Sequence, residues 1–310
     1  MIHLPLKDQE EVPDKLNSIT ALRRLNAIVE EEDGSQLMSY YYGDDIVRDK
    51  LRAFSIHKNE FEEGDLAKCY YCESYAEVVA TLQVEHYRPK ACVDPQDTGG
   101  IAHAGYYWLI LEWTNLVLSC PKCNGRDAKG NRFPVRGLRA QPVNPILIDN
   151  EIMSLNRQHC YAIGNPLIDE SPLLINPEID NPSDFLSFNL NGHLIGHGDD
   201  PDRGNATIEI CKLNRGALIE SRISFWNEIK KEILDYCAIF QMGKIGEGGI
   251  YQLFKMTARK IYEKQRPKEE YSFFGQFINN EIDRFIEIDI PPDFHVVFKN
   301  AYTDFIRENT

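Results

Sequence analysis

The stretch NLVLSCPKCN, residues 115–124, decides the fold predicted for this chain. Its first part, NLVLSC, is a short apolar run that predicts a buried β-strand. The run leads directly into a Cys-x-x-Cys pair, Cys120 and Cys123. Such a pair lets two thiolates reach one tetrahedral Zn²⁺. The stretch therefore predicts a strand that ends inside a metal site.

A second pair completes the predicted metal site. Cys69 and Cys72 have the same spacing in CYYC, and 47 residues separate the two pairs. This insert exceeds that of a compact zinc ribbon, so it must be a folded element whose two ends the metal joins. We predict one structural Zn²⁺ on these four cysteines. A redox pair, which needs only one Cys-x-x-Cys, and ordinary buried thiols are the alternatives.

Four further cysteines have no such pairing: Cys92, Cys160, Cys211 and Cys237. We expect them to be small buried hydrophobes. Disulfides are not expected, because the first residues carry no secretion signal and the chain is long. No stretch approaches the length of a membrane span, so the expected compartment is the cytoplasm.

The 310 residues are 43% hydrophobic, which is enough for one elaborated domain or two small ones. The net charge of −14 weighs against nucleic-acid binding, but the charge is uneven. Residues 86–140 contain eight Lys/Arg and four Asp/Glu, a local charge of +4. A local basic strip on an acidic body can hold a phosphate backbone, although a solvated charged surface is an equal alternative.

Periodicity predicts an α+β protein. Strands are expected within EVVATLQVEHY (77–87) and NLVLSC (115–120), with a loop at 94–100 and a hairpin at 185–197 that turns at Asn191-Gly192. Helices are expected at 14–32, 44–62, 217–240, 251–264 and 271–288. The predicted segments are an N-terminal helical cap (1–65), a cysteine-rich module (66–140), a Pro-rich linker with the hairpin (141–205) and a helical C-terminal extension (206–310).

Chemistry-bearing residues lie between the two cysteine pairs. Glu85 and His86 occur in VEHYRPK, Asn115 precedes the second pair and Asn124 follows it, at the expected start of a helix. If the two strands pair, the zinc brings Glu85 and His86 close to Asn124. A regular strand would point Glu85 and His86 to opposite faces. Both would serve one site only if the backbone bends there or if the site lies at the end of the strand, which Pro89 favours.

The segments CYYCE, VEHYRPK, GYYWLILEWTNLVLSCPKCN and KGNRFPV resemble an HNH endonuclease, the ββα-metal fold, over about 75 residues. Two downstream segments, SPLLINPEIDNPSDFLSFNLNGHLIG and TIEICKLNRGALIESR, resemble the C-terminal part of the HNH subunits called PtuB. Those subunits occur in Septu-type and some retron anti-phage systems. The resemblance implies a central ββα-metal module at 66–140 and a partner similar to the ATPase subunit PtuA.

The resemblance also implies roles for single residues. His86 would be the general base, Asn115 would hold the loop and orient the base, and Glu85 and Asn124 would bind a catalytic divalent ion. The signature therefore reads H-N-N, and an amide oxygen suits a hard cation such as Mg²⁺ or Mn²⁺. The product would carry a 5′-phosphate and a 3′-hydroxyl. Four basic residues are predicted to contact nucleic acid: Arg126, Lys129, Arg132 and Arg136. Lys129 lies farther from Asn124 than the family pattern leads us to expect.

Each candidate also has a structural interpretation. His86 would be a structural histidine bonded to a backbone carbonyl, Glu85 would form a salt bridge with Arg88, Asn115 would cap a turn and Asn124 would be a helix N-cap. The aromatic residues of YYWLILEW are interpreted as core rather than as base-stacking groups, and His103 as a loop residue.

We therefore expect a metal-dependent HNH endonuclease with a PtuA-like ATPase partner. A zinc-stapled binding scaffold without catalysis is one alternative. An HNH nuclease directed at RNA, for instance a tRNA, is another, because metal-assisted phosphodiester cleavage does not depend on the 2′-hydroxyl.

Overall fold

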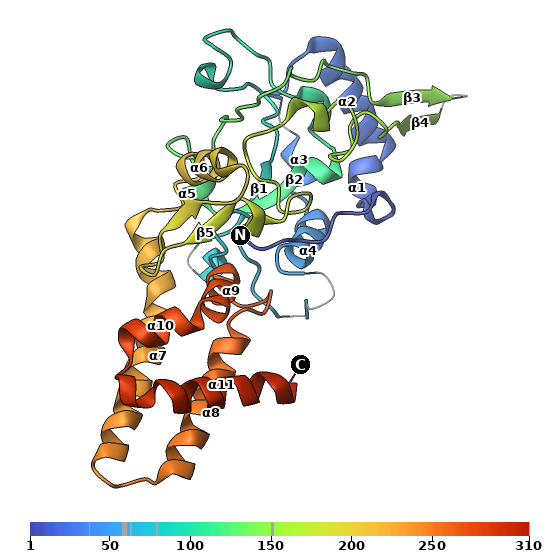
Figure 1. Cartoon of the computed structure of the whole chain (residues 1–310). Helices are drawn as coiled ribbons and strands as arrows, with labels where there is room; N and C mark the ends of the chain where they lie inside the picture. The colour runs from blue at the N-terminus through green and yellow to red at the C-terminus, as the bar shows by residue number, and fades with distance from the viewer. Residues whose placement is uncertain (37, 58–60, 63, 79, 150–151, 310) are drawn as a thin grey trace. The chain divides into compact units, whose positions relative to one another are not determined.

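A computed structural model describes the chain except residues 37, 58–60, 63, 79, 150–151 and 310. The described residues form helices and small antiparallel sheets, which confirms the predicted α+β class. They divide into two compact units (Figure 1). The first unit comprises Met1–Leu186 and Ile195–Leu213, and the second comprises Ser187–Leu194 and Asn214–Thr310. The four segments expected from the sequence remain a prediction.

The centre of the first unit is an antiparallel pair of short strands. β1 (Gln83–His86) pairs with β2 (Leu116–Ser119), with Gln83 opposite Ser119 and His86 opposite Leu116. The predicted first strand begins later than expected, because residues 76–78 form a 3₁₀ turn and β2 offers only four partners. Residue 79 of that expected strand lies outside the described residues. Every residue of β2 is buried, so this pair lies within the core.

A short helix follows β2 without a loop. α5 (Pro121–Asn124) begins with a proline, which needs no hydrogen-bond partner at the first helical position. Cys120 precedes it in an extended conformation, and its carbonyl accepts a hydrogen bond from the Cys123 amide at 3.0 Å. The helix begins earlier than predicted, so Asn124 ends it. The interpretation of Asn124 as a helix N-cap is therefore wrong.

The N-terminal helices are shorter than predicted. The helix expected at 14–32 divides into α1 (Asp14–Asn17) and α2 (Ile19–Glu31), because Ser18 is extended and its hydroxyl caps α2. α3 (Ser39–Tyr42) and α4 (Asp45–Phe54) follow. α4 ends at Phe54 rather than at 62; residues 58–60 of the expected helix lie outside the described residues. The apolar side of α4 packs against β2.

The Pro-rich segment folds with short pieces of regular structure. β3 (Ile146–Asp149) pairs with β4 (Ile152–Leu155), and the predicted hairpin is confirmed as β5 (Leu186–Phe188) with β6 (Leu194–Gly196). Gly192 has φ of +77°, as its predicted turn requires. α6 (Pro201–Ile210) follows. The 3₁₀ helices are η1 (Gln9–Glu11), η2 (Ala76–Val78), η3 (Pro95–Asp97), η4 (Tyr107–Leu109), η5 (Trp113–Asn115), η6 (Ile168–Glu170), η7 (Pro182–Asp184) and η8 (Pro292–Phe294).

The second unit is mainly helical. α7 (Gly216–Gln241) and α8 (Glu247–Glu263) pack against each other and are joined by a short turn, and α11 (His295–Asn309) packs on α8 (Figure 1). The helix expected at 271–288 divides at Glu281 into α9 (Ser272–Asn280) and α10 (Ile282–Asp289). Within the described part of the chain, no helix combines the length and the apolar character that a membrane crossing needs.

Candidate metal centre and active site

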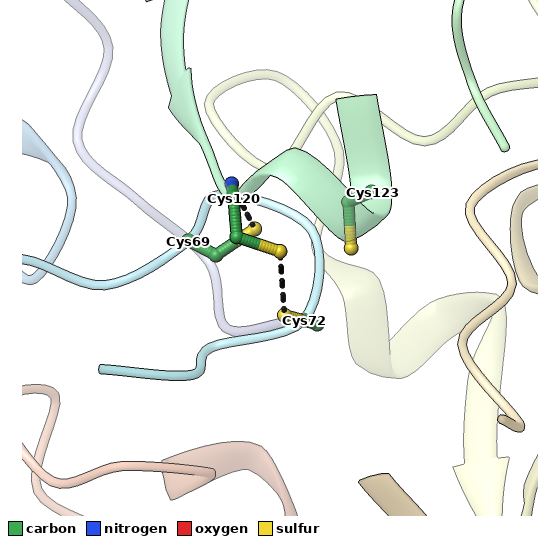
Figure 2. Close-up of side chains that lie close together, drawn as sticks. All are labelled: Cys69, Cys72, Cys120 and Cys123. Carbon is green, nitrogen blue, oxygen red and sulfur yellow. Dashed lines mark hydrogen bonds between the residues drawn. The ribbon is translucent and has the colours of Figure 1, made fainter. Parts of the chain in front are cut away.

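The four paired cysteines lie together. Cys69 and Cys72 come from the turn before β1, and Cys120 and Cys123 come from the junction of β2 and α5 (Figure 2). Their sulfur atoms all lie within 4.8 Å of one another, and all four residues are buried. Four thiolates at this spacing suit a tetrahedral Zn²⁺. The structure thus confirms the predicted cysteine cluster, which can hold a metal such as zinc.

The thiols of this cluster have pKa values that shift in opposite directions. Contact with the Cys123 thiol, and with those of Cys69 and Cys72, lowers the pKa of Cys120 far below its ordinary value, whereas contact with Cys120 raises the pKa of Cys72 and of Cys123. The Cys120 amide donates a hydrogen bond to the Cys69 sulfur at 3.3 Å (Figure 2). Thiolate is the form that binds metal, and an amide donor stabilises its charge. Cys120 is therefore a favoured thiolate of the cluster.

Three of the remaining cysteines are buried, as predicted: Cys160, Cys211 and Cys237. Cys92 is exposed, so its prediction as a buried hydrophobe is wrong. It follows β1 in the loop that leads to η3, and the Asn131 side-chain amide lies 2.8 Å from its sulfur. Apolar character alone did not distinguish a loop cysteine from a core cysteine.

A polar hollow of about 510 Å³ lies beside the cysteine cluster. It is lined by Glu85 from β1, Asn124 from the end of α5, and by Asp94, Arg126, Gly130 and Asn131. The Asn124 side-chain nitrogen also donates a hydrogen bond to the side-chain oxygen of Gln83 at 3.0 Å. Gln83 lies on the same face of β1 as Glu85. The structure therefore brings the two predicted ligands of the catalytic ion, Glu85 and Asn124, to one hollow.

The donor set of this hollow fits a hard cation. Glu85 and Asp94 offer carboxylate oxygens, and Asn124 and Asn131 offer amide oxygens. Oxygen donors of this kind are those that Mg²⁺ and Mn²⁺ prefer. Asp94 and Asn131 were not predicted from the sequence. Asp94 lies in the loop expected at 94–100 and Asn131 lies in KGNRFPV, and neither segment indicates that the two residues line one hollow.

Lys129 faces Glu85 from within the protein. Its ammonium forms an ion pair with the Glu85 carboxylate and donates a hydrogen bond to the His86 carbonyl at 2.9 Å. The lysine side chain is 0% exposed. Burial raises the pKa of Glu85, and the Lys129 charge opposes that effect. Lys129 does not reach a phosphate backbone from this position, and the structural alternative of a Glu85–Arg88 salt bridge is also wrong.

His86 points to the opposite strand face from Glu85. Its Nε2 lies 3.0 Å from the Ile110 carbonyl oxygen, and its ring makes an edge contact with Tyr42 at 4.9 Å between centroids. A carbonyl only accepts, so Nε2 carries the proton and Nδ1 carries the lone pair. Burial lowers the pKa of His86 to about 3, so the ring is neutral at pH 7. His86 is not among the residues that line the hollow.

The bond from Nε2 to the Ile110 carbonyl fits the interpretation of His86 as a structural histidine. The same bond leaves the other ring nitrogen, Nδ1, with a lone pair that can accept a proton. Among the described residues, Nε2 makes the one hydrogen bond of the ring, and Nδ1 has no hydrogen-bond partner.

Asn115 fixes the chain immediately after His86. Its side-chain oxygen accepts a hydrogen bond from the Arg88 amide at 2.8 Å, and its side-chain nitrogen donates to the Arg88 carbonyl at 3.1 Å and to the Leu109 carbonyl at 3.4 Å. The side chain is buried and continues the pairing of β1 with β2 beyond the last strand residue. These contacts tie the chain after His86 to the segment around Leu109.

The remaining predicted basic residues differ in their surroundings. Arg126 is exposed and lines the hollow. Arg132 pairs with Asp97, with 3.0 Å between Nε and the carboxylate, and Arg136 pairs with Asp200. Since these carboxylates already neutralise Arg132 and Arg136, Arg126 is the best placed of the four for a phosphate at the hollow.

A buried carboxylate supports the loop behind this site. Glu170 is 0% exposed and accepts hydrogen bonds from Arg88 at 2.8 Å, from the Tyr106 hydroxyl at 2.6 Å and from the Ala140 amide at 2.8 Å. Sequence reasoning missed this residue, because its partners lie 30 to 82 positions away. The predicted burial of the aromatic run is confirmed for Tyr106, Tyr107, Trp108 and Trp113.

Comparison with known proteins places this site in context. The chain is 34% identical over 181 residues to a Bacillus mycoides (strain KBAB4) protein named Septu protein PtuB, a match of 57% of this chain and 54% of the relative. It is 30% identical over 177 residues to Septu protein PtuA of the same strain, a match of 56% of this chain and 21% of that relative. The chain resembles Septu proteins.

These matches confirm the resemblance to Septu PtuB that was predicted from the sequence. The matched part of the chain spans about half the length of the PtuB relative and about a fifth of the PtuA relative. No protein-family profile and no solved structure matches the chain.

Proposed function

We propose that this protein is a metal-dependent HNH endonuclease and the nuclease component of a Septu-type anti-phage system. The observation that carries the proposal is the hollow lined by carboxylate and amide oxygens beside β1 and α5. The elements follow in the order β1, β2 and α5, and the cysteine pairs before β1 and after β2 meet in one cluster. The similarity to Septu PtuB supports the choice of system. Nucleic-acid phosphodiesters are the proposed substrate, with DNA preferred and RNA as the alternative.

In this proposal each residue has a distinct task. Glu85 and Asn124, with Asp94 and Asn131, would hold Mg²⁺ or Mn²⁺. A bound ion of this kind supplies positive charge to the phosphate and to the leaving oxygen. His86, the last residue of β1, does not line the hollow here, so its ring would have to turn toward the hollow to take the proton of the attacking water at Nδ1, the nitrogen that its bond to Ile110 leaves unprotonated. The products would carry a 5′-phosphate and a 3′-hydroxyl.

Two further residues would serve the same reaction. Asn115 would hold the backbone that positions His86, through its bonds to Arg88. Arg126 would contact a phosphate beside the hollow, where it adds a positive charge to the exposed rim.

A partner subunit is also part of the proposal. The matched segment of the PtuA relative covers only 21% of that protein, so a segment similar to this chain occurs within a much longer one. We propose that an ATPase subunit similar to PtuA binds this protein and controls its activity.

A second candidate function is a zinc-stapled scaffold that binds nucleic acid or protein without cleaving it. The burial of His86 and its bond to Ile110 favour this alternative, because a histidine held in this way also serves structure alone. In the scaffold the hollow would bind without catalysing a reaction.

A nicking assay separates the two candidates. Supercoiled DNA and a tRNA pool are incubated with Mg²⁺ or Mn²⁺ and the zinc-loaded protein, with and without the PtuA-like partner. The endonuclease predicts cleavage by wild-type protein and a loss of about 10²–10⁴-fold in His86→Ala, the contribution of a general base. His103→Ala, a loop histidine that does not line the hollow, is the matched control and should cleave like wild type. Absence of cleavage under all conditions, with nucleic acid still bound, would establish the scaffold.

A further inference from the structure

The Lys129 ammonium contacts the carboxylate that is proposed to bind the divalent ion. It contacts three oxygen acceptors, the Glu85 carboxylate, the His86 carbonyl at 2.9 Å and the Gly130 carbonyl at 3.4 Å. Glu85 is also the charged residue of β1 that lines the hollow beside Asn124. The ammonium and a divalent ion in the hollow would therefore share the Glu85 carboxylate.

The backbone after the second cysteine pair holds Lys129 in this position. The Lys129 amide donates a hydrogen bond to the Cys123 carbonyl at 3.1 Å, and the Ala128 amide donates to the Gly125 carbonyl at 2.9 Å. Gly130 then has φ of +42°, a conformation that favours glycine and reverses the chain. The loop thus folds back onto α5, so the cysteine cluster fixes the start of the lysine side chain.

Charge balance makes the two cations alternatives. A buried carboxylate needs a positive partner, and Lys129 provides it. A divalent ion on Glu85 and Asn124 would lie within a few ångströms of this ammonium, and like charges at such distances strongly disfavour each other. A long, unbranched lysine side chain has several rotatable bonds, so its ammonium can leave the carboxylate without a movement of the backbone.

We propose that Lys129 is an internal competitor of the catalytic divalent ion. In the metal-free protein its ammonium neutralises Glu85, and binding of the divalent ion to Glu85 and Asn124 displaces it. The inference rests on the proposed function, since it concerns the metal site of that reaction. Its consequence is that Lys129 sets the concentration of divalent ion at which the site fills.

The test measures Mn²⁺ binding rather than activity. Zinc-loaded full-length protein is titrated with Mn²⁺, and the free ion is followed by its electron paramagnetic resonance signal. Lys129→Met should bind Mn²⁺ at least roughly tenfold more tightly than wild type, because a like charge is removed from the site. Lys122→Met is the control: it removes an exposed lysine of α5 with the same change in net charge, and should bind like wild type.

A second variant guards against misfolding. Lys129→Gln removes the charge but keeps a side-chain donor for the His86 carbonyl, and it should also bind Mn²⁺ more tightly. Both variants are checked for retained zinc and for a cooperative thermal transition. If neutral variants bind Mn²⁺ equally or more weakly than wild type, Lys129 supports the metal site instead of competing with it, and the inference is wrong.

Glu85→Gln separates this outcome from failure of the proposed function. If wild-type protein binds Mn²⁺ and Glu85→Gln does not, Glu85 is a ligand of the proposed metal site. The Lys129 variants then test separately whether Lys129 competes with the ion. When no variant and no wild-type protein binds Mn²⁺ beyond the zinc site, both the catalytic metal and the role of Lys129 are refuted.

Discussion

Removal of one cysteine pair should strongly destabilise the first unit. The perturbation is the double variant Cys120→Ser/Cys123→Ser, which eliminates the metal ligands at the junction of β2 and α5. A metal on the four cysteines joins two points of the chain separated by 47 residues between Cys72 and Cys120. Closing a loop of this length corresponds to about 4 kcal/mol of unfolding free energy in the chain-entropy treatment of cross-links.

This loss is large compared with the stability of a domain. Typical unfolding free energies are about 5–15 kcal/mol. For a unit of this size, each kcal/mol lowers the melting temperature by about 2–4 °C, so the expected decrease is about 8–16 °C beyond the effect of the serines themselves. The matched control is Cys160→Ser/Cys211→Ser, which places two serines at buried cysteines of the same unit outside the cluster.

Differential scanning calorimetry with zinc analysis by mass spectrometry makes this comparison. We expect one zinc in wild type and in the control, no zinc in the Cys120/Cys123 variant, and the additional decrease in melting temperature only there. A zinc-free wild-type protein, or equal melting temperatures for the two double variants, would refute the reasoning that a metal clamps this fold.

Three other predictions concern single side chains. Asn115→Ala should lower the unfolding free energy by about 2–3 kcal/mol in chemical denaturation, because it leaves the buried Arg88 amide and carbonyl without their partner; a change below that of a surface Asn→Ala variant would contradict this. Glu170→Ala should lower the unfolding free energy by about 3–5 kcal/mol, because it leaves the Arg88 guanidinium buried without its carboxylate. In the same denaturation assay, Arg88→Met/Glu170→Leu should recover much of this loss; an equal loss in the double variant would argue against an ion-pair effect. Arg126→Ala should weaken nucleic-acid binding and reduce the slope of log affinity against log salt by about 0.9, as measured by fluorescence anisotropy, whereas Lys122→Ala should change the slope less; an unchanged slope would remove Arg126 from the interface.

Local patterns predicted the elements around the metal cluster well. The two Cys-x-x-Cys pairs predicted that four cysteines meet, and the apolar run before Cys120 predicted a buried strand; the structure confirms both the cluster and β2. The long helix α7 also followed, because its apolar periodicity extends over several turns. Boundaries were less predictable, since Ser18 and Glu281 interrupt helices at positions where periodicity continues.

The surroundings of the candidate site depended on long-range contacts that no local pattern encodes. The pairing of Lys129 with Glu85 joins residues 44 positions apart, and its charge suggested a surface residue. Glu170 and Asp94 reach the site region through irregular segments whose paths composition does not determine. The sequence did indicate that a regular strand separates Glu85 from His86, and the strand is regular there.

Anomalous diffraction from crystals of the zinc-loaded protein soaked in Mn²⁺ would locate both of the proposed ions in one experiment. Data collected at the zinc and manganese absorption edges identify each ion by its position. We expect zinc among Cys69, Cys72, Cys120 and Cys123, and manganese at the hollow between Glu85 and Asn124. Zinc at the cysteines with no manganese at Glu85 would contradict the proposed active site, and absence of both ions would contradict the metal-clamped fold itself.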